Sequence, residues 1–109
     1  MRAGPVYKLL RAAEWAEALA RGVFDGSATD KADGFIHFSA ATQVRVTAAK
    51  HFAGESGLIL AAVDPGLLPF PLKWEPSRGG RLFPHLYAPL PLSAVPKTWS
   101  VPPFPPEIP

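Results

Sequence analysis

The sequence contains no cysteine among its 109 residues. This absence excludes disulfides, thiolate nucleophiles and cysteine-bound metals, and it leaves the redox compartment undetermined. Long apolar runs are also missing. No stretch approaches the roughly 18 residues that a membrane helix needs, and the N-terminus lacks the apolar segment of a signal peptide. We therefore expect a cytoplasmic protein that has no membrane partner.

Charged residues are few, and the two signs nearly balance. Eleven Lys and Arg oppose nine Asp and Glu, so the pI of 9.2 reflects a small excess and not a polybasic surface. No run of Lys or Arg occurs, which argues against nucleic-acid binding by charge alone and makes RNA a weak expectation as partner. The sequence also lacks G-x-G-x-x-G, a P-loop and G-x-S-x-G, which excludes the usual nucleotide-binding and hydrolase signatures.

The residues that are present predict a folded protein. An apolar share of 48% with three tryptophans is typical of a globular domain, and this length suffices for one core of two layers. We expect a single domain over residues 1–101. Eight of the 14 prolines lie from Pro89 to Pro109, so residues 102–109 are expected to be an extended, polyproline-like tail.

The first half of the chain predicts two helices among three strands. Strands are expected at residues 6–10, around His37 and at 58–63, and amphipathic helices over 12–21 and 40–53. The polar segment 24–34 is expected to be a loop. The continuous apolar run at 58–63 is typical of a central strand that is buried on both faces.

The second half predicts further strands at 72–75, 82–87 and within 94–101. Leu72 and Trp74 alternate with charged residues and are expected to point inward. Pro84 has no N–H, so its strand is expected to lie at a sheet edge or to be bulged. The order of elements predicts an α+β or mixed α/β class.

His37 and Ser39, in the sequence DGFIHFS, alternate on one face of an expected strand. Two rises separate their side chains by roughly 6.6 Å, which suits two polar groups that hold one edge of a ligand. Structural roles remain open for both: Ser39 as the N-cap of the next helix, and His37 as a hydrogen-bonded core residue. The sequence offers no convincing acid partner for His37, which argues against a serine hydrolase.

His85 and Tyr87 form a second same-face pair, with Phe83 beside them. Such a row suits a flat aromatic ligand, although an edge strand with a polar outer face has the same pattern. Lys73 and Glu75 also share a face, where a cross-strand salt bridge is the simplest expectation.

The loop RGGR at residues 78–81 is the best candidate for anion binding. Its glycines allow backbone N–H groups to converge between two arginines, but a hairpin turn with solvated arginines is equally compatible. His51 is expected only to end a helix. A metal site made by His37, His85 and a carboxylate has no supporting spacing, so we expect no metal.

Several motifs together resemble one bacterial family. They are VYKLL, RGVFDGS, DGFIHFS, HFAG, LILAAVD, LKWEPSRGG and LFPHLY. Over about residues 5–100, the chain resembles the small domains known as domain of unknown function 952. This resemblance implies an α+β, ADP-ribosyltransferase-like fold, in which two small, mostly antiparallel sheets and two main helices surround a cleft. That cleft binds NAD in the active relatives.

A more distant similarity is to NAD-dependent RNA 2′-phosphotransferases. It implies that His37 and Ser39 line the cleft and that Arg78 contacts phosphate. Lys8 stands where those relatives have a histidine in the first strand. No acid occupies residues 82–87, where a glutamate that aligns the ribose hydroxyls would be sought.

The patterns and the resemblance together define the candidate site. The catalytic candidates are His37, Glu75 and His85, and the candidates for binding NAD or another ligand are Tyr7, Lys8, Ser39, Arg78 and Tyr87. Two functions remain open. One is a transferase or glycohydrolase acting on NAD or a related nucleotide, and the other is a catalytically silent module that binds a nucleotide, a phosphorylated metabolite or an RNA end. A third alternative is a protein-interaction role, with the proline tail bound in an aromatic groove of a partner.

Overall fold

The computed structural model describes residues 4–105, apart from the side chain of Arg78. Its largest sheet has four antiparallel strands in the order β4 (Ser39–Ala40), β1 (Val6–Arg11), β5 (Leu58–Val63) and β9 (Lys97–Val101). The apolar strand β5 pairs along its whole length with β1 and lies at the centre of the core, as its sequence predicts.

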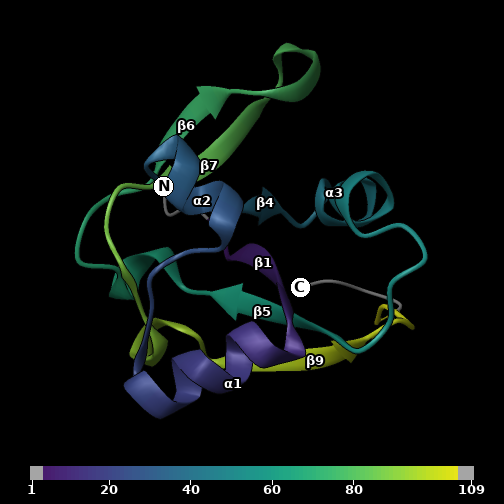
Figure 1. Cartoon of the computed structure of the whole chain (residues 1–109). Coiled ribbons are helices and arrows are strands. Elements are labelled where there is room, and N and C mark those ends of the chain that lie inside the picture. Colours follow the sequence, from purple (N-terminus) through teal and green to yellow (C-terminus); the bar gives the residue numbers. More distant parts are fainter. Residues whose placement is uncertain (1–3, 106–109) are drawn as a thin grey trace.

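A second, three-stranded antiparallel sheet lies across from the first (Figure 1). Its order is β3 (Ile36–His37), β7 (Leu82–Leu86) and β6 (Lys73–Pro76), and a two-stranded ribbon pairs β2 (Val23–Phe24) with β8 (Leu90–Pro91). The helices are α1 (Ala12–Arg21), α2 (Ala28–Asp33) and α3 (Val44–His51), with short 3-10 turns at Pro65–Leu67, Arg78–Gly80 and Leu92–Ala94. The predicted α+β class with small antiparallel sheets is confirmed. No helix within residues 4–105 is long and apolar enough to cross a membrane.

Strand alternation divides the core into two clusters on opposite faces of the large sheet. Val6 and Leu10 of β1 pack with α1, whereas Tyr7 and Leu9 pack with α3. Helices α1 and α3 therefore cover opposite faces. Lys8 has the same parity as Val6 and Leu10, so the alternation places a lysine on the apolar α1 side.

The prediction of a loop at residues 24–34 is wrong, because α2 lies within this segment. Ser27 and Asp30 form a reciprocal capping box: the Ser27 hydroxyl accepts from the Asp30 N–H at 3.1 Å, and the Asp30 carboxylate accepts from the Ser27 N–H at 2.9 Å. Gly34 ends the helix in the left-handed conformation, with φ of 87°. A helix of six residues is too short to show a clear apolar period, so only its caps mark it.

The next helix is shorter than expected. Helix α3 begins after Gln43, and Ser39 instead lies in β4, so the N-cap prediction for Ser39 is wrong. The Ser39 hydroxyl lies 2.8 Å from the hydroxyl of Thr47 in α3. Ser39 thus ties the strand to α3 without capping it.

Two predictions about the second sheet are also wrong. Trp74 points outward and is 42% exposed. Pro84 lies in the central strand β7 and not at an edge. The Pro84 carbonyl accepts from the N–H of Phe38 at 3.0 Å, so the ring nitrogen of Pro84 faces the same neighbouring segment. This segment lies beyond His37, the last paired residue of β3, so the N–H that proline lacks would make no hydrogen bond between β3 and β7.

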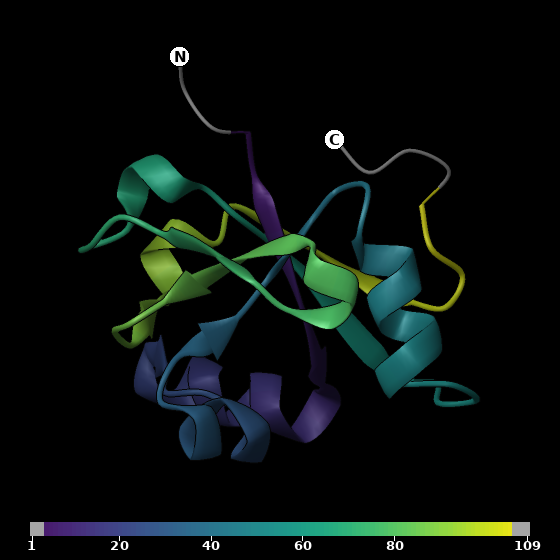
Figure 2. The same cartoon turned by 90° about the horizontal axis from the view of Figure 1, so that it is seen from above.

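Residues 36–40 pass from the three-stranded sheet to the four-stranded sheet. His37 of β3 pairs with His85 of β7, whereas Ser39 of β4 pairs with Tyr7 of β1. The pairing of β4 with β1 stops at Tyr7, so the next residue of β1, Lys8, lies in the fork where the sheets diverge. Figure 2 shows the β6–β7 hairpin crossing over the larger sheet when the molecule is seen from above.

Candidate functional site

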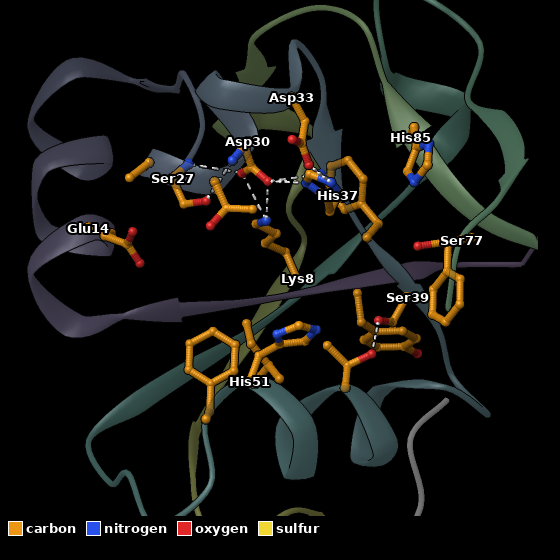
Figure 3. Close-up of a pocket in the computed structure, with 18 of the residues that line it drawn as sticks. Lys8, Glu14, Ser27, Asp30, Asp33, His37, Ser39, His51, Ser77 and His85 are labelled. Atoms are coloured by element: carbon orange, nitrogen blue, oxygen red, sulfur yellow. Dashed lines mark hydrogen bonds and ion pairs between the residues drawn. The ribbon is translucent and has the colours of Figure 1, made fainter. Parts of the chain in front are cut away.

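A cavity of about 450 Å³ lies in this fork (Figure 3). Its size falls within the range of small-molecule sites, about 300–1,000 Å³. The polar and charged side chains at its wall are Tyr7, Lys8, Arg11, Glu14, Ser27, Thr29, Asp30, Asp33, His37, Ser39, Thr47, His51, Ser77 and His85. They come from β1, all three helices and the strands of the fork, so only the folded chain brings them together.

The carboxylate of Asp30 organises one wall of the cavity. It is 2% exposed and accepts from Lys8 Nζ at 2.9 Å, from the Ser27 N–H at 2.9 Å, and from both the N–H and the Nδ1 of His37, at 3.1 and 2.6 Å. A buried carboxylate needs such donors, because burial of an uncompensated charge is very unfavourable. Asp30 thereby fixes Lys8 and His37 relative to each other, as the dashed lines in Figure 3 show.

These contacts set the charge state of the pair. Burial by itself raises the pKa of Asp30, but the hydrogen bond from His37 and the positive charge of Lys8 outweigh it, so the pKa lies well below its usual range. Burial lowers the pKa of Lys8, and the charge of Asp30 opposes that change. Lys8 and Asp30 are a buried ion pair whose charges cancel, so Lys8 adds little net positive charge to the cavity.

His37 lies between two carboxylates. Its Nδ1 contacts Asp30, and its Nε2 lies 2.9 Å from Oδ2 of Asp33. An ionised carboxylate only accepts hydrogen bonds, so each contact requires a hydrogen on the ring nitrogen that makes it. Asp33 is 48% exposed, whereas Asp30 is buried. Asp30 is thus the fixed partner of His37, and Asp33 is the one that can move.

His85 has a carboxylate partner of its own, from the second sheet. Its Nδ1 lies 2.8 Å from Oε1 of Glu75, which also accepts from the Tyr87 hydroxyl at 2.8 Å. The hydrogen bonds from His85 and Tyr87 lower the pKa of Glu75, and the bond to Glu75 raises the pKa of Tyr87. Glu75 does not pair with Lys73, whose Nζ lies over the Tyr87 ring at 4.9 Å. Of the cross-strand contacts expected for these two residues, Glu75 pairs with His85 of the neighbouring strand, and Lys73 contacts the Tyr87 ring in place of a carboxylate.

Five of the eight candidate residues named from the sequence border the cavity. They are Tyr7, Lys8, His37, Ser39 and His85. Glu75 and Tyr87 lie behind His85 and are not part of the wall. The side chain of Arg78 lies outside the described part of the structure, although its neighbour Ser77 is at the wall.

Sequence reasoning missed the acid that partners His37. Asp30 lies in the first turn of α2, seven residues before His37, and Asp33 is the last residue of the same helix. The signal was the pattern Ser-x-x-Asp at residues 27–30 followed by Gly34, which is typical of a short capped helix. Within residues 4–105, no group of three or more His, Cys, Asp or Glu is arranged to hold a metal ion.

Comparisons with known proteins place the chain in a family. The crystal structure of protein CC0527 from Caulobacter crescentus matches with 53% sequence identity and a TM-score of 0.83, covering 88% of this chain and 84% of that one. Its solution NMR structure matches with 52% identity and a TM-score of 0.79, covering 89% and 84%. Among curated proteins there is no match. Residues 9–98 match the family described as "Protein of unknown function (DUF952)", and the chain therefore belongs to this family.

Proposed function

We propose that this protein is a transferase or glycohydrolase directed at NAD or a related nucleotide, on an ADP-ribosyltransferase-like fold. The observation that most supports the proposal is the position of the candidate residues. Five of them, contributed by four strands, border the same cavity between the two sheets. Nucleotide-sized ligands bind in concave sites of this size, with a few placed polar groups.

The carboxylate partners of His37 and His85 also support the proposal. A carboxylate fixes one nitrogen of His37 and one of His85, and both rings border the cavity. Carboxylate-held imidazoles are suited to orienting a ribose hydroxyl or moving a proton near neutral pH. Cleavage of the nicotinamide–ribose bond passes through an oxocarbenium-like state, which gains from groups fixed before the reaction.

One observation favours a catalytically silent binding module as the second candidate. Asp33 already occupies Nε2 of His37, and Asp30 neutralises Lys8. In that arrangement both ring nitrogens of His37 are bonded to carboxylates, so neither nitrogen is free to move a proton for a ligand. This favours a module that binds a nucleotide, a phosphorylated metabolite or an RNA end without turnover.

Ligand binding separates both candidates from other functions. We would titrate the isotope-labelled protein with NAD, ADP-ribose and ATP, and follow the histidine side chains and the backbone signals of α2 by NMR. Both candidates predict shifts at the cavity wall. Absence of any shift at millimolar ligand would exclude both nucleotide functions.

Turnover separates the two candidates from each other. Nicotinamide release from NAD would be measured for the wild type, His37→Gln and Glu17→Gln. Glu17 is an exposed residue of α1 outside the cavity, so it controls for loss of a surface charge. An enzyme that depends on His37 should lose about 10²–10⁴-fold in rate in His37→Gln alone. Binding of NAD with equal background rates in all three proteins would instead support the silent module.

A further inference from the structure

His85 has one ring nitrogen whose hydrogen-bonding capacity is not used. The residue is 3% exposed in the central strand β7, and its Nε2 has no hydrogen-bond partner among the described residues. Buried polar groups in folded proteins are almost always hydrogen-bonded, so such an atom in a residue that borders the cavity requires an explanation. Nε2 is enclosed, so bulk water does not supply the missing partner.

The other nitrogen determines what kind of partner Nε2 requires. Nδ1 lies 2.8 Å from Oε1 of Glu75, and this carboxylate has a lowered pKa, so it is an ionised acceptor. Nδ1 must then carry a hydrogen, and in a neutral imidazole the remaining nitrogen carries the lone pair. In the neutral ring, Nε2 of His85 is therefore an acceptor that lacks a donor.

Packing holds the ring in this orientation. Phe35 stacks on His85 with ring centroids 4.1 Å apart, and His37 meets it edge-on at 5.3 Å. Both ring nitrogens of His37 contact carboxylates, whereas His85 has one carboxylate partner, at Nδ1. Of these two neighbouring rings, His85 is therefore the one with an unpartnered nitrogen among the described residues.

We infer that His85 is the proton acceptor of this cavity, and that the ligand presents an O–H donor, either a hydroxyl or a bound water, to Nε2. The O–H bond breaks and an Nε2–H bond forms. The resulting imidazolium keeps its Nδ1–H bond to Glu75. Once the products have left, the imidazolium releases the Nε2 proton to water in the cavity, which restores the neutral ring with its hydrogen on Nδ1 beside Glu75.

Applied to NAD, this step rests on the proposed function. Water gives its proton to His85 while its oxygen bonds to the ribose C1′. The bond between C1′ and the nicotinamide nitrogen breaks, and nicotinamide leaves with the bonding electron pair. The net products are nicotinamide, ADP-ribose and one proton, which His85 releases from Nε2 to water after the products leave.

The charged groups around His85 come from both neighbouring strands. From β6, Glu75 contacts Nδ1, and Lys73 lies opposite His85 in the strand register. From β3, His37 meets the ring edge, and beyond β7 the Tyr87 hydroxyl shares the Glu75 oxygen. Glu75 is the only one of these groups that contacts a His85 nitrogen in residues 4–105, so it determines which nitrogen carries the hydrogen.

The first experiment uses the wild-type protein without ligand. Long-range ¹H–¹⁵N NMR spectra of the histidine side chains distinguish protonated from unprotonated ring nitrogens. We expect a neutral His85 to have a hydrogen on Nδ1 and none on Nε2, and this preference to weaken in Glu75→Gln. A hydrogen on Nε2 of the neutral ring would overturn the inference.

The second experiment measures nicotinamide release by the wild type, His85→Gln, Glu75→Gln and the control Glu17→Gln. We expect His85→Gln to lower kcat about 100-fold with NAD affinity within about 3-fold, and Glu75→Gln to lower kcat less. A wild-type kcat in His85→Gln would overturn the inference. Should His85→Gln fail to fold, the half-exposed Glu75→Gln carries the kinetic test. Should the wild type release no nicotinamide, the proposed function fails, and the spectrum of the wild type decides the role of His85 alone.

Discussion

Lys8 Nζ lies 2.9 Å from Oδ2 of Asp30, and the two side chains are only 9% and 2% exposed. This buried pair joins the first strand of the large sheet to the short helix α2. The same carboxylate fixes His37. One acidic residue therefore stabilises the fold and orients a histidine of the candidate site.

Asp30→Asn should strongly destabilise the protein. The substitution leaves the ammonium of Lys8 buried without a counter-charge and weakens the capping box with Ser27. Removal of one partner from a buried pair typically costs about 3–5 kcal/mol. Urea unfolding would measure the loss. Asp25→Asn, which removes a half-exposed carboxylate paired with Arg21, is the matched control and should change the free energy of unfolding by less than about 1 kcal/mol.

Asp30 should also make stability depend on pH in the acid range. Its pKa is lower in the folded protein than in the unfolded chain, so the unfolded chain binds more protons as the pH falls. Its stabilisation is complete above the unfolded value, about 3.9, and is lost as the pH falls toward the folded value. Urea midpoints of the wild type should therefore fall as the pH is lowered from about 5 to about 2. Asp30→Asn should show a smaller fall, and an equal fall would contradict this assignment.

Gly26→Ala should perturb the site more than Gly34→Ala. Both glycines have a positive φ, 116° and 87°, so alanine strains the backbone at either position. A Cβ at Gly34 would meet open space, but one at Gly26 would lie 2.9 Å from the Cβ of Asp30. We expect Gly34→Ala to cost about 1–2 kcal/mol and Gly26→Ala to cost more. Only Gly26→Ala should shift the NMR signals of His37 and Lys8, and equal shifts in both variants would contradict the close contact.

Ser39 and Thr47 should be energetically coupled. Their hydroxyls are 2.8 Å apart, and Ser39 does not cap α3. Ser39→Ala should lower the free energy of unfolding by about 1 kcal/mol. In a double-mutant cycle with Thr47→Val, the coupling energy should be at least about 0.5 kcal/mol. Additive losses would show instead that Ser39 acts independently of the helix hydroxyl.

Much of the fold could be predicted from the sequence, because its main elements have strong local patterns. The helix at 12–21 ends at Gly22 in the left-handed conformation, and the apolar run at 58–63 is the central strand. The short helix α2 was missed because six residues carry little periodicity. The prediction that Pro84 lies at a sheet edge or bulge was wrong because a central strand tolerates proline where the neighbouring strand has already ended. Here β3 ends beside Pro84, which the sequence of β7 alone does not reveal.

The sequence by itself determined the residue types of the candidate site and the strands that carry most of them. Alternation placed Lys8 on one face of β1, and the pattern DGFIHFS marked His37 as unusual. Only the tertiary structure decided how these residues are paired. Asp30 reaches Lys8 and His37, and Glu75 reaches His85, because a helix and a hairpin distant along the chain fold against the fork between the two sheets. Such pairs are stable because a buried charge requires a partner. Local sequence patterns do not predict which residues pair, because the packing of whole helices and strands sets the distances between these carboxylates and histidines.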